Sequence, residues 1–375
     1  MSGPFLLISA FSGRAAAMAA RRAGYVPLVA DLFADADTCA VAAGVRRVAG
    51  DIAAGFDADA LLGALDELAA EADGPPLGLV YGAGFEDRPE LLARIAGRWP
   101  LIGNAPETVA AVKEPWRLAD TLAGLGIPHP EIMPLNGAAP PGWLIKRQGG
   151  AGGGHISPSG AAPGQGTYAQ RHVAGRPVSA LFLSHADGVD IVGFSEQWTA
   201  PTPGQPFRFG GAVCPADLPE PLAAAMAEAV RKTARAFALR GLNSADFIAG
   251  PDGWWLLEIN PRLGATLDIF DDAAGSLLKA HVAAAQGRPC APIRPLLRAH
   301  VVQVVYAASA IRVPPIAWPD WTADRPHPGE QIPAQGPLCT LLATADSPCE
   351  ARQLCLERDN QIQKLMGVEE CRTAS

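Results

Sequence analysis

Acidic and amide side chains recur between residues 246 and 262 in a pattern that suits a divalent cation. The apolar stretch WWLLEINPR, residues 254–262, carries Glu258, Asn260 and Arg262 at every second position. The turn GPDG before it closes a hairpin in which Asp246 lies opposite Glu258 or one position from it. Two carboxylates that face each other across a strand pair repel by up to about 1 kcal/mol, and by more when buried. A divalent cation between them removes that cost.

The donor atoms of this group are all oxygen, which is the preference of Mg²⁺. Strand side chains alternate between the two faces, so Asn260 shares the face of Glu258 and both can converge with Asp246. The pattern therefore predicts a magnesium site with Asp246, Glu258 and Asn260 as ligands, and with Arg262 one step further to meet an anion. An edge strand whose polar face meets water has the same spacing and is the alternative.

A glycine-rich loop follows a strand that ends in a lysine. The strand GWLIK ends at Lys146, and Gly149, Gly150, Gly152, Gly153 and Gly154 follow within eight residues. Bare backbone N–H groups of such a loop can wrap a phosphate chain, and the lysine supplies the compensating charge. The loop has neither the G-K-[ST] ending of a P-loop nor the G-x-G-x-x-G register, because His155 stands at the last position. A flexible linker is the alternative interpretation.

Lysine is rare in this chain, so each lysine carries information. Lys113 stands where two short helices meet, at Lys113-Glu114-Pro115, because Pro115 suits a first helical turn. Taken alone, Lys113 is typical of a solvated surface lysine. Its place in the order of features is more specific: a junction lysine, a strand lysine, a glycine loop, and then the hairpin with the carboxylates.

The elements that must position these residues fall into successive regions. Buried strands and amphipathic helices alternate through residue 104, which predicts a parallel α/β sheet. Short helices and strands from 105 to 175 predict a small α+β region. A long amphipathic helix over 218–240, with Gly241 as its stop signal, precedes the hairpin. The last region, 291–375, contains apolar strands, a proline-rich stretch and a polar helix near its end.

Composition excludes several classes of function. A net charge of −8 speaks against nucleic acid as a partner, since phosphate backbones need a basic face. The longest apolar stretches are about half the ~20 residues that a membrane span needs. No secretory signal pattern is present at the amino terminus, so a cytoplasmic location is expected. Seven cysteines without a C-x-x-C pair predict free thiols.

In this order the features resemble the ATP-grasp superfamily of carboxylate–amine ligases, over roughly residues 1–290. The resemblance implies an ATP-grasp fold of mixed α/β and α+β class, with ATP and Mg²⁺ or Mn²⁺ bound between two lobes. The implied domains are an α/β domain (1–104), a small ATP-binding lobe (105–175), a large lobe with the metal site (176–290) and a β-rich extension (291–375).

The resemblance also implies roles for individual residues. Lys113 and Lys146 match the two phosphate-binding lysines, with Lys146 and Arg262 in catalytic roles, and the loop through Gly150, Gly152, Gly153 and Gly154 matches the flap over the phosphates. Gln170 and Val173 in YAQRHVAG occupy the hinge that meets the adenine. Asp246, Glu258 and Asn260 match the magnesium ligands, and Arg262 matches the arginine that meets an acyl phosphate. The chain departs from the pattern at Pro177, where many relatives place a ribose-binding glutamate.

The activity implied is an ATP-dependent ligation of a carboxylate, such as glutamate, to an amine through an acyl phosphate. The stretches VYGAGFEDRPELL, LIGN and GPLCT also resemble a branch met in methanopterin- and methanofuran-type one-carbon cofactor pathways. We expect the strand ends at 12–14 and 82–86 to face the cleft and receive the acid, because ligands gather at the carboxyl ends of parallel strands. A tight βα turn at Gly82 and Gly84 is an equal alternative.

Two other functions remain open on the sequence. One is a non-catalytic nucleotide-binding protein, which the missing ribose glutamate favours. The other is a nucleotide-dependent oxidoreductase built on VYGAGFED, which lacks the third glycine of the dinucleotide fingerprint. The expected partners are small-molecule acids and amines, with no nucleic acid and no membrane. A homodimer is the default expectation.

Overall fold

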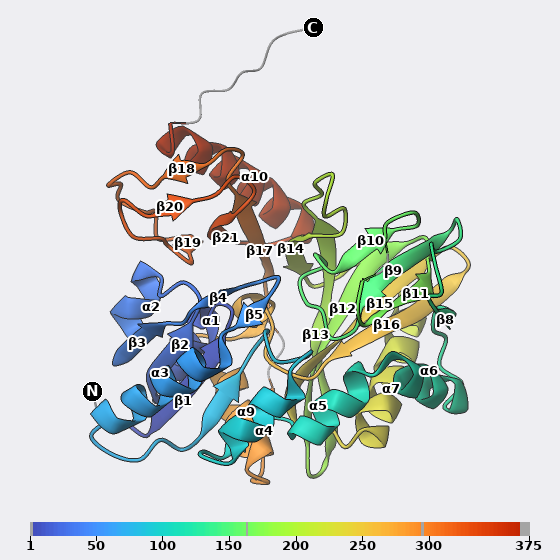
Figure 1. Ribbon diagram of the computed structural model, residues 1–375, viewed down its shortest axis with the longest axis horizontal. Helices are drawn as coiled ribbons and strands as arrows, with labels where there is room; N and C mark the ends of the chain where they lie inside the picture. The colour runs from blue at the N-terminus through green and yellow to red at the C-terminus, as the bar shows by residue number, and fades with distance from the viewer. Residues whose placement is uncertain (1–2, 163, 294–295, 368–375) are drawn as a thin grey trace, which may run out of the picture.

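The amino-terminal domain is built on a parallel five-stranded sheet. The computed structural model describes residues 3–162, 164–293 and 296–367, and Figure 1 shows this domain beside the other sheets. The strand order is β3-β2-β1-β6-β7, and every pairing is parallel, as expected. The central strands read as continuous apolar runs because helices cover both faces of a parallel sheet. Its elements are β1 (Phe5–Ala10), α1 (Arg14–Arg22), β2 (Val26–Asp31), α2 (Ala36–Val41), β3 (Gly44–Arg47), β4 (Gly50–Asp51), β5 (Gly55–Phe56), α3 (Ala58–Glu71), β6 (Leu79–Tyr81), α4 (Pro89–Ala96) and β7 (Leu101–Ile102).

Two helices connect this domain to a small antiparallel sheet. The first ends at Lys113 because Pro115 has no N–H to continue its hydrogen bonds. Glu114 then caps the second helix by accepting from the N–H groups of Trp116 and Arg117. The strand order of the small sheet is β10-β9-β11-β8. The elements are α5 (Pro106–Lys113), α6 (Pro115–Gly124), β8 (Ile132–Pro134), β9 (Trp143–Arg147), β10 (Ile156–Pro158) and β11 (Thr167–Arg171).

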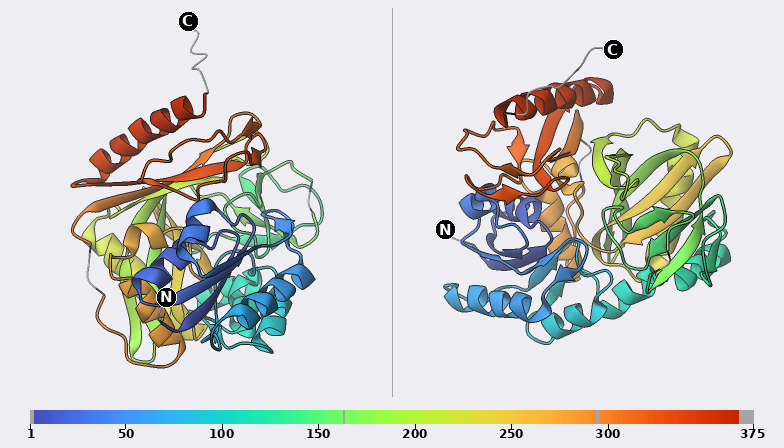
Figure 2. Two further views of the ribbon diagram at one scale, coloured as in Figure 1. Left: turned by 90° about the vertical axis from the view of Figure 1, so that its left-hand side faces the viewer. Right: turned by 45° about the horizontal axis from the view of Figure 1, so that its top comes forward.

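An eight-stranded sheet forms the centre of the rest of the described molecule, with helices and the two-stranded sheet β18-β20 around it. Its order is β16-β15-β12-β13-β14-β17-β21-β19, so strands on both sides of the expected boundary at 290 share one sheet. β17 pairs with β14, and α10 packs on β17 and β21 at the top of Figures 1 and 2. The elements are β12 (Arg176–His185), β13 (Gly188–Thr199), β14 (Phe209–Cys214), α7 (Glu220–Ala236), β15 (Gly241–Gly250), β16 (Gly253–Asn260), α8 (Leu267–Phe270), α9 (Ser276–Ala285), β17 (Ala299–Tyr306), β18 (Ile311–Arg312), β19 (Thr322–Ala323), β20 (Gln331–Ile332), β21 (Pro337–Ala345) and α10 (Pro348–Leu365).

One helix boundary differs from the sequence expectation. α7 ends at Ala236, five residues before Gly241. Ala238 adopts the left-handed conformation, with φ 49°, in the turn that follows the helix. Gly241 instead opens β15, where its left-handed φ of 68° places the backbone against the His281 ring. The prediction that Gly241 ends the helix was therefore wrong. A glycine is favoured at this position because the backbone passes close to the His281 ring.

Two expectations from composition concern the whole chain. No helix among residues 3–162, 164–293 and 296–367 is long and apolar enough to cross a membrane. The six cysteines in these ranges are free, as expected. Cys371 lies outside the described residues.

Candidate active site

The hairpin predicted from GPDG is formed by β15 and β16. Asp246 pairs directly with Glu258, so the expected opposition of two carboxylates is confirmed. A bulge follows this pair, between Asp246 and Phe247, and shifts the register of the remaining strand. Asn260 pairs with Ser244 on the same side of the bulge. The hairpin therefore brings three oxygen-bearing side chains to one end of the large sheet.

Both carboxylate oxygens of Asp246 accept hydrogen bonds. Ser179 Oγ on β12 donates to one carboxylate oxygen at 2.6 Å, and Asn260 Nδ2 donates to the other at 2.9 Å. Burial and the charge of Glu258 raise the pKa of Asp246, although the Ser179 hydrogen bond opposes this. The two carboxylates therefore repel each other, and a cation bound between them would reduce that repulsion.

Lys113 lies among the oxygens of this group. Its Nζ donates to Glu258 Oε2 at 3.3 Å, to Asn260 Oδ1 at 3.2 Å and to the carbonyl of Ile259 at 3.4 Å. The Lys113 side chain is 4% exposed, so the solvated-lysine alternative is wrong. Burial alone would raise the pKa of Glu258, but the charges of Lys113 and Lys146, together with the Lys113 hydrogen bond, hold that pKa far below its usual range. Glu258 is therefore an anion in a largely enclosed site.

The donor set fits a hard divalent cation of the magnesium type. In the part of the chain that the structure describes, no three His, Cys, Asp or Glu side chains form a metal-binding group. Two carboxylates and the Asn260 amide do converge on the hairpin. Mg²⁺ accepts such a small protein ligand set because water and nucleotide phosphates complete its octahedron. The buried repulsion at Asp246 is the observation that favours a cation here.

The second lysine lies on the small sheet, near enough to the hairpin for its charge to lower the pKa of Glu258. Lys146 Nζ donates to Gln170 Oε1 at 3.2 Å, and both residues are buried. The β9–β11 pairing places Tyr168 beside Lys146, and Gln170 beside Leu144. Val173 follows β11 in the link to β12 and is partly buried. The two predicted hinge residues and Lys146 thus lie at the join between the small and the large sheet.

The glycine loop presents unused backbone donors. Within the described residues, the N–H groups of 151–155 have no hydrogen-bond acceptor in the protein. Gly152 and Gly153 both adopt left-handed φ values, of 66° and 76°. A loop of free N–H groups with this backbone form is suited to an anion. The arrangement is consistent with the predicted phosphate role of Gly150, Gly152, Gly153 and Gly154.

His155 closes the loop against the carboxylate hairpin. Its ring packs so tightly on Gly150 that a Cβ there would lie 2.1 Å from the imidazole. Its Nδ1 is buried with no hydrogen-bond partner among the described residues. Burial lowers the pKa of His155 to about 4, with Lys146 and Lys113 adding to the effect and Glu258 opposing it. The ring is therefore neutral at physiological pH and has an unsatisfied nitrogen.

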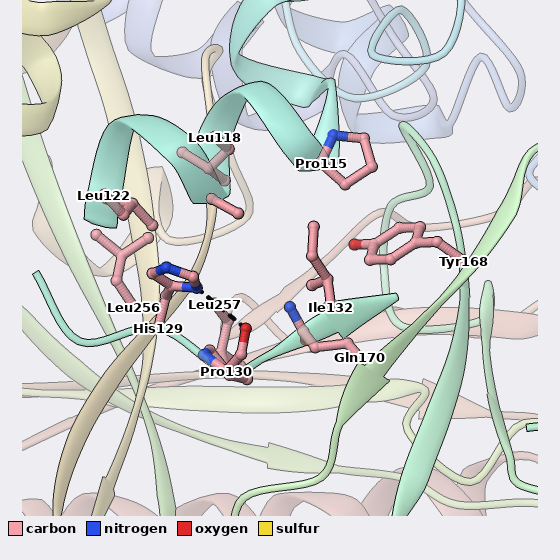
Figure 3. Close-up of a pocket in the computed structure, with 11 residues that line it drawn as sticks. Pro115, Leu118, Leu122, His129, Pro130, Ile132, Tyr168, Gln170, Leu256 and Leu257 are labelled. Carbon is pink, nitrogen blue, oxygen red and sulfur yellow. Dashed lines mark hydrogen bonds between the residues drawn. The ribbon is translucent and has the colours of Figure 1, made fainter. Parts of the chain in front are cut away.

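Two adjoining hollows lie between α6, β11 and β16. One includes Lys113, Gly149, Gly150, His155 and Glu258 in its lining. Most residues that line the other have apolar side chains, and it is drawn in Figure 3. In Figure 3 the Tyr168 hydroxyl and the Gln170 amide point toward its centre. An apolar hollow beside a cationic one matches the two ends of a nucleotide, a base and a phosphate chain.

Arg262 is paired with the amino-terminal domain. Its Nε donates to Glu86 Oε1 at 2.7 Å, and the other oxygen of Glu86 accepts from the N–H groups of Gly84 and Phe85. Burial opposes ionisation, yet the charge of Arg262 lowers the pKa of Glu86. The loop 82–86 therefore lies at the site, as expected. The glycines after β6 support this pair, and the oxidoreductase interpretation gains nothing from them.

The other expected strand end serves a different purpose. Arg14 is 2% exposed and donates to Asp268 at 2.5 and 2.7 Å and to Asp324 at 2.9 and 3.2 Å. Ser12 donates to Asp324 at 2.7 Å, and the Gly13 N–H donates to Asp31. The expectation that 12–14 receive the acid was wrong, because carboxylates of the chain itself bind the Ser12 hydroxyl, the Gly13 N–H and the Arg14 guanidinium. These residues join the amino-terminal domain to α8 and to the carboxyl-terminal region.

Several site residues were missed from the sequence. Ser179 and Tyr168 gave no signal, because hydroxyl side chains on strands are common. His155 was noticed only as a break in a glycine motif, although a histidine inside a glycine loop was itself a signal. Pro177, at the place of the expected ribose glutamate, pairs with Ile248 in β12–β15 and offers no hydrogen-bonding side chain.

Comparisons with known proteins agree with the fold. Residues 112–266 match the family model of the ATP-grasp domain. No curated protein matches the sequence. Among solved structures, biotin carboxylase of Campylobacter jejuni, in complex with βγ-ATP, has a TM-score of 0.68 at 15% identity, over 93% of this chain and 89% of that one.

Two further structures have a similar fold. The N5-carboxyaminoimidazole synthetase of Staphylococcus aureus, complexed with ADP, has a TM-score of 0.67 at 13% identity, over 95% of this chain and 97% of that one. The biotin carboxylase domain of 2-oxoglutarate carboxylase from Hydrogenobacter thermophilus, in complex with MgADP, ADP and bicarbonate, has a TM-score of 0.68 at 13% identity, over 97% and 90% of the two chains. The chain thus has the ATP-grasp fold, and its residues 112–266 match the model of the ATP-grasp domain.

Proposed function

We propose that this protein is an ATP- and Mg²⁺-dependent ligase that joins a carboxylate to an amine through an acyl phosphate. The observation that carries the proposal is the position of Lys113 among the oxygens of Glu258 and Asn260. It brings the junction lysine to the carboxylate hairpin, at a hollow also lined by the glycine loop. Each of these parts binds a different portion of a metal–triphosphate.

The residues divide the work of phosphoryl transfer. Lys113 and Lys146 neutralise phosphate oxygens, and the free N–H groups of 151–155 bind the phosphate chain. Asp246, Glu258 and Asn260 hold the magnesium ion, which supplies charge neutralisation at the transferring phosphoryl group. Gln170 and Val173 place the adenine. Because the site is fixed before the substrate arrives, each such contact contributes on the order of 3 kcal/mol in the transition state.

The acid substrate binds where Arg262 meets the loop 82–86. The side chain of Arg262 is 11% exposed, and its Nε and Nη1 are engaged by Glu86 and Leu263. Its outer edge is directed to the substrate carboxylate, which attacks the γ-phosphate of ATP to give an acyl phosphate and ADP. The amine then attacks the acyl carbon, and inorganic phosphate leaves.

The resemblance to the branch met in one-carbon cofactor pathways supports a narrower proposal for the substrate and the pathway. The acid is an amino acid such as glutamate, and the reaction belongs to the biosynthesis of a one-carbon cofactor in the cytoplasm. The chain acts on small molecules, as a monomer or a homodimer. A non-catalytic nucleotide-binding role is the second candidate, favoured by Pro177 in place of a ribose-binding side chain.

The test is a substrate screen with a matched variant. Purified protein is incubated with ATP, Mg²⁺ and pools of amino acids and amines, and both ADP and product mass are measured. Glu258→Gln keeps the volume of the side chain but removes its charge, and we expect at least a 100-fold loss of ADP formation. Glu228→Gln, at an exposed glutamate on α7, is the control for an equal change of charge.

Either of two results would overturn the proposal. One is a folded Glu258→Gln variant, checked by its melting temperature, that turns over at the wild-type rate. The other is ATP binding by the wild type without ADP formation across the whole panel, which is the outcome expected of the non-catalytic candidate.

A further inference from the structure

The glycine loop rests on the loop between β13 and β14. The N–H of Phe209 donates to the carbonyl of Gly152 at 3.0 Å. The backbone of Gly153 lies so close to Phe207 that a Cβ at this glycine would be 1.9 Å from the Phe207 carbonyl oxygen. The position of the glycine loop is therefore set by the segment 200–209.

The carboxyl-terminal strands hold that segment in turn. Arg208 is 8% exposed, and its guanidinium stacks on the Tyr306 ring at 3.5 Å. It donates to the carbonyl of Gln335 at 2.9 Å and to the side-chain oxygen of Gln335 at 3.3 Å. The Tyr306 hydroxyl donates to the carbonyl of Phe209 at 2.8 Å.

These contacts form a continuous chain of hydrogen bonds from β17 to the glycine loop. Phe209 accepts from Tyr306 through its carbonyl and donates to Gly152 through its N–H. Tyr306 lies on β17 and Gln335 just before β21, beyond the domain that matches the ATP-grasp family model. A displacement of β17 or β21 would therefore change the position of the glycine loop.

We infer that Arg208, Tyr306 and Gln335 form a latch that holds the glycine loop closed over the nucleotide. They are positioning residues, since the described contacts link them to the loop and not to the carboxylate hairpin. The inference rests on the proposed function for its consequence: a latched loop keeps water from the acyl phosphate until the amine attacks. It also gives the region after residue 291 a role in the reaction.

The competing explanation is that these contacts only stabilise the strands and do not control the glycine loop. In that case the Tyr306 hydroxyl would only stabilise the edge between β14 and β17, and its loss would loosen those strands together with the loop. The latch predicts that the loop contact loosens while the β14–β17 pairing stays intact. The two explanations therefore differ in where the effect appears.

The variant Tyr306→Phe separates them, because it removes the hydroxyl but keeps the ring under Arg208. Hydrogen exchange is measured at the Phe209 amide, which bonds to Gly152, and at the Ala212 and Val213 amides of β14. One of these two β14 amides faces β17, because successive N–H groups of a strand point in opposite directions. We expect exchange at Phe209 to rise roughly 3- to 10-fold and exchange at Ala212 and Val213 to stay unchanged. Tyr25→Phe is the control, because Tyr25 lies between α1 and β2, outside the latch. Unchanged exchange at Phe209, or equal increases at Phe209 and at the β14 amides, would overturn the latch.

A second measurement connects the latch to catalysis. ADP formation is compared with and without the amine, at saturating acid and ATP. Tyr306→Phe should raise the share of ADP formed without amine at least 3-fold, because acyl phosphate is lost to water. An unchanged share would overturn the protective role. If the wild type forms no ADP at all, the proposed ligase function fails, whereas the exchange experiment still decides whether the latch exists.

Discussion

At the scale of single residues, the arrangement of the site follows from the balance between its carboxylates and the positive charges beside them. Asp246 and Glu258 face each other in a partly enclosed hairpin, which is unfavourable without a cation. Lys113 supplies one positive charge by binding Glu258 and Asn260, and this leaves Asp246 with a raised pKa. Ionised Asp246 is therefore the carboxylate that its buried surroundings stabilise least. A metal ion brought by a nucleotide would complete the balance.

His155 gives the sharpest prediction at this scale. His155 lines the hollow that includes Lys113 and Glu258, and its buried Nδ1 has no hydrogen-bond partner in the described part of the chain. A hydrogen bond from it to a charged phosphate is worth about 1.5–3 kcal/mol, so His155→Ala should weaken ATP binding roughly 10- to 100-fold. His155→Asn places an amide nitrogen close to the Nδ1 position and should retain most of the affinity. Titration with a fluorescent ATP analogue measures both, and equal affinity of the alanine variant and the wild type would contradict the assignment.

At the scale of elements, the conformation of the glycine loop is set by the segments that it contacts. Its two ends continue into the paired strands β9 and β10, and its middle rests on the segment 200–209. Gly152 and Gly153 share the left-handed backbone, so a side chain at either costs about 1–2 kcal/mol of strain. Only Gly153 also faces a carbonyl at close range, whereas a Cβ at Gly152 meets nothing within 4 Å.

This difference makes the two glycines a matched pair. Gly152→Ala and Gly153→Ala carry the same backbone strain, but only Gly153→Ala must push the loop away from Phe207. We expect Gly153→Ala to raise the KM for ATP at least 10-fold and Gly152→Ala to change it less than 3-fold. Steady-state ADP formation gives both values. Similar effects of the two substitutions would mean that the contact with Phe207 does not govern loop closure.

At the scale of the whole molecule, ion pairs and one long sheet join the parts. The sheet runs from the carboxylate hairpin at β16 to β19 without a break. Arg14 binds Asp268 and Asp324 and so ties the amino-terminal domain to both α8 and the carboxyl-terminal region. Beside this contact, Asp35 is 5% exposed, and the N–H of Ala36 donates to Arg325. The junction between the first and last parts of the chain is thus rich in buried carboxylates.

Asp35 makes the stability of this junction depend on pH. Burial, with the charges of Asp324, Asp31, Asp37 and Glu330, raises the pKa of Asp35 to about 8. The folded protein therefore binds a proton that the unfolded chain releases near pH 4, and the stability from this group falls as pH rises from about 4 to 8. Asp35→Asn mimics the protonated form. Its melting temperature should exceed that of the wild type by a few degrees at pH 8.5, and by less at pH 5.5.

The control for this prediction is Asp120→Asn, at an exposed position on α6. Its melting temperature should differ from the wild type by a similar amount at both pH values. A difference between Asp35→Asn and the wild type that stays constant from pH 5.5 to 8.5 would show that Asp35 is already ionised in the folded protein.

Local patterns determined much of this protein. The period-two spacing of Glu258 and Asn260 and the GPDG turn were enough to predict the carboxylate hairpin, because strand alternation and turn chemistry act over a few residues. Pro115 likewise determined the helix junction at Lys113. The order of lysines, glycine loop and hairpin then indicated the ATP-grasp fold, which the comparisons confirm.

Only the tertiary structure decided which groups meet across the chain. Arg14 and Arg262 both follow motifs that suit an anion, yet Arg14 is bound by Asp268 and Asp324, whereas Arg262 reaches the site beside Glu86. The contact of Tyr306 with Phe209, and so with the glycine loop, joins positions nearly a hundred residues apart. No local spacing encodes such pairs, because burial and charge are settled by how the sheets pack, and a buried donor takes whichever acceptor the fold brings within reach.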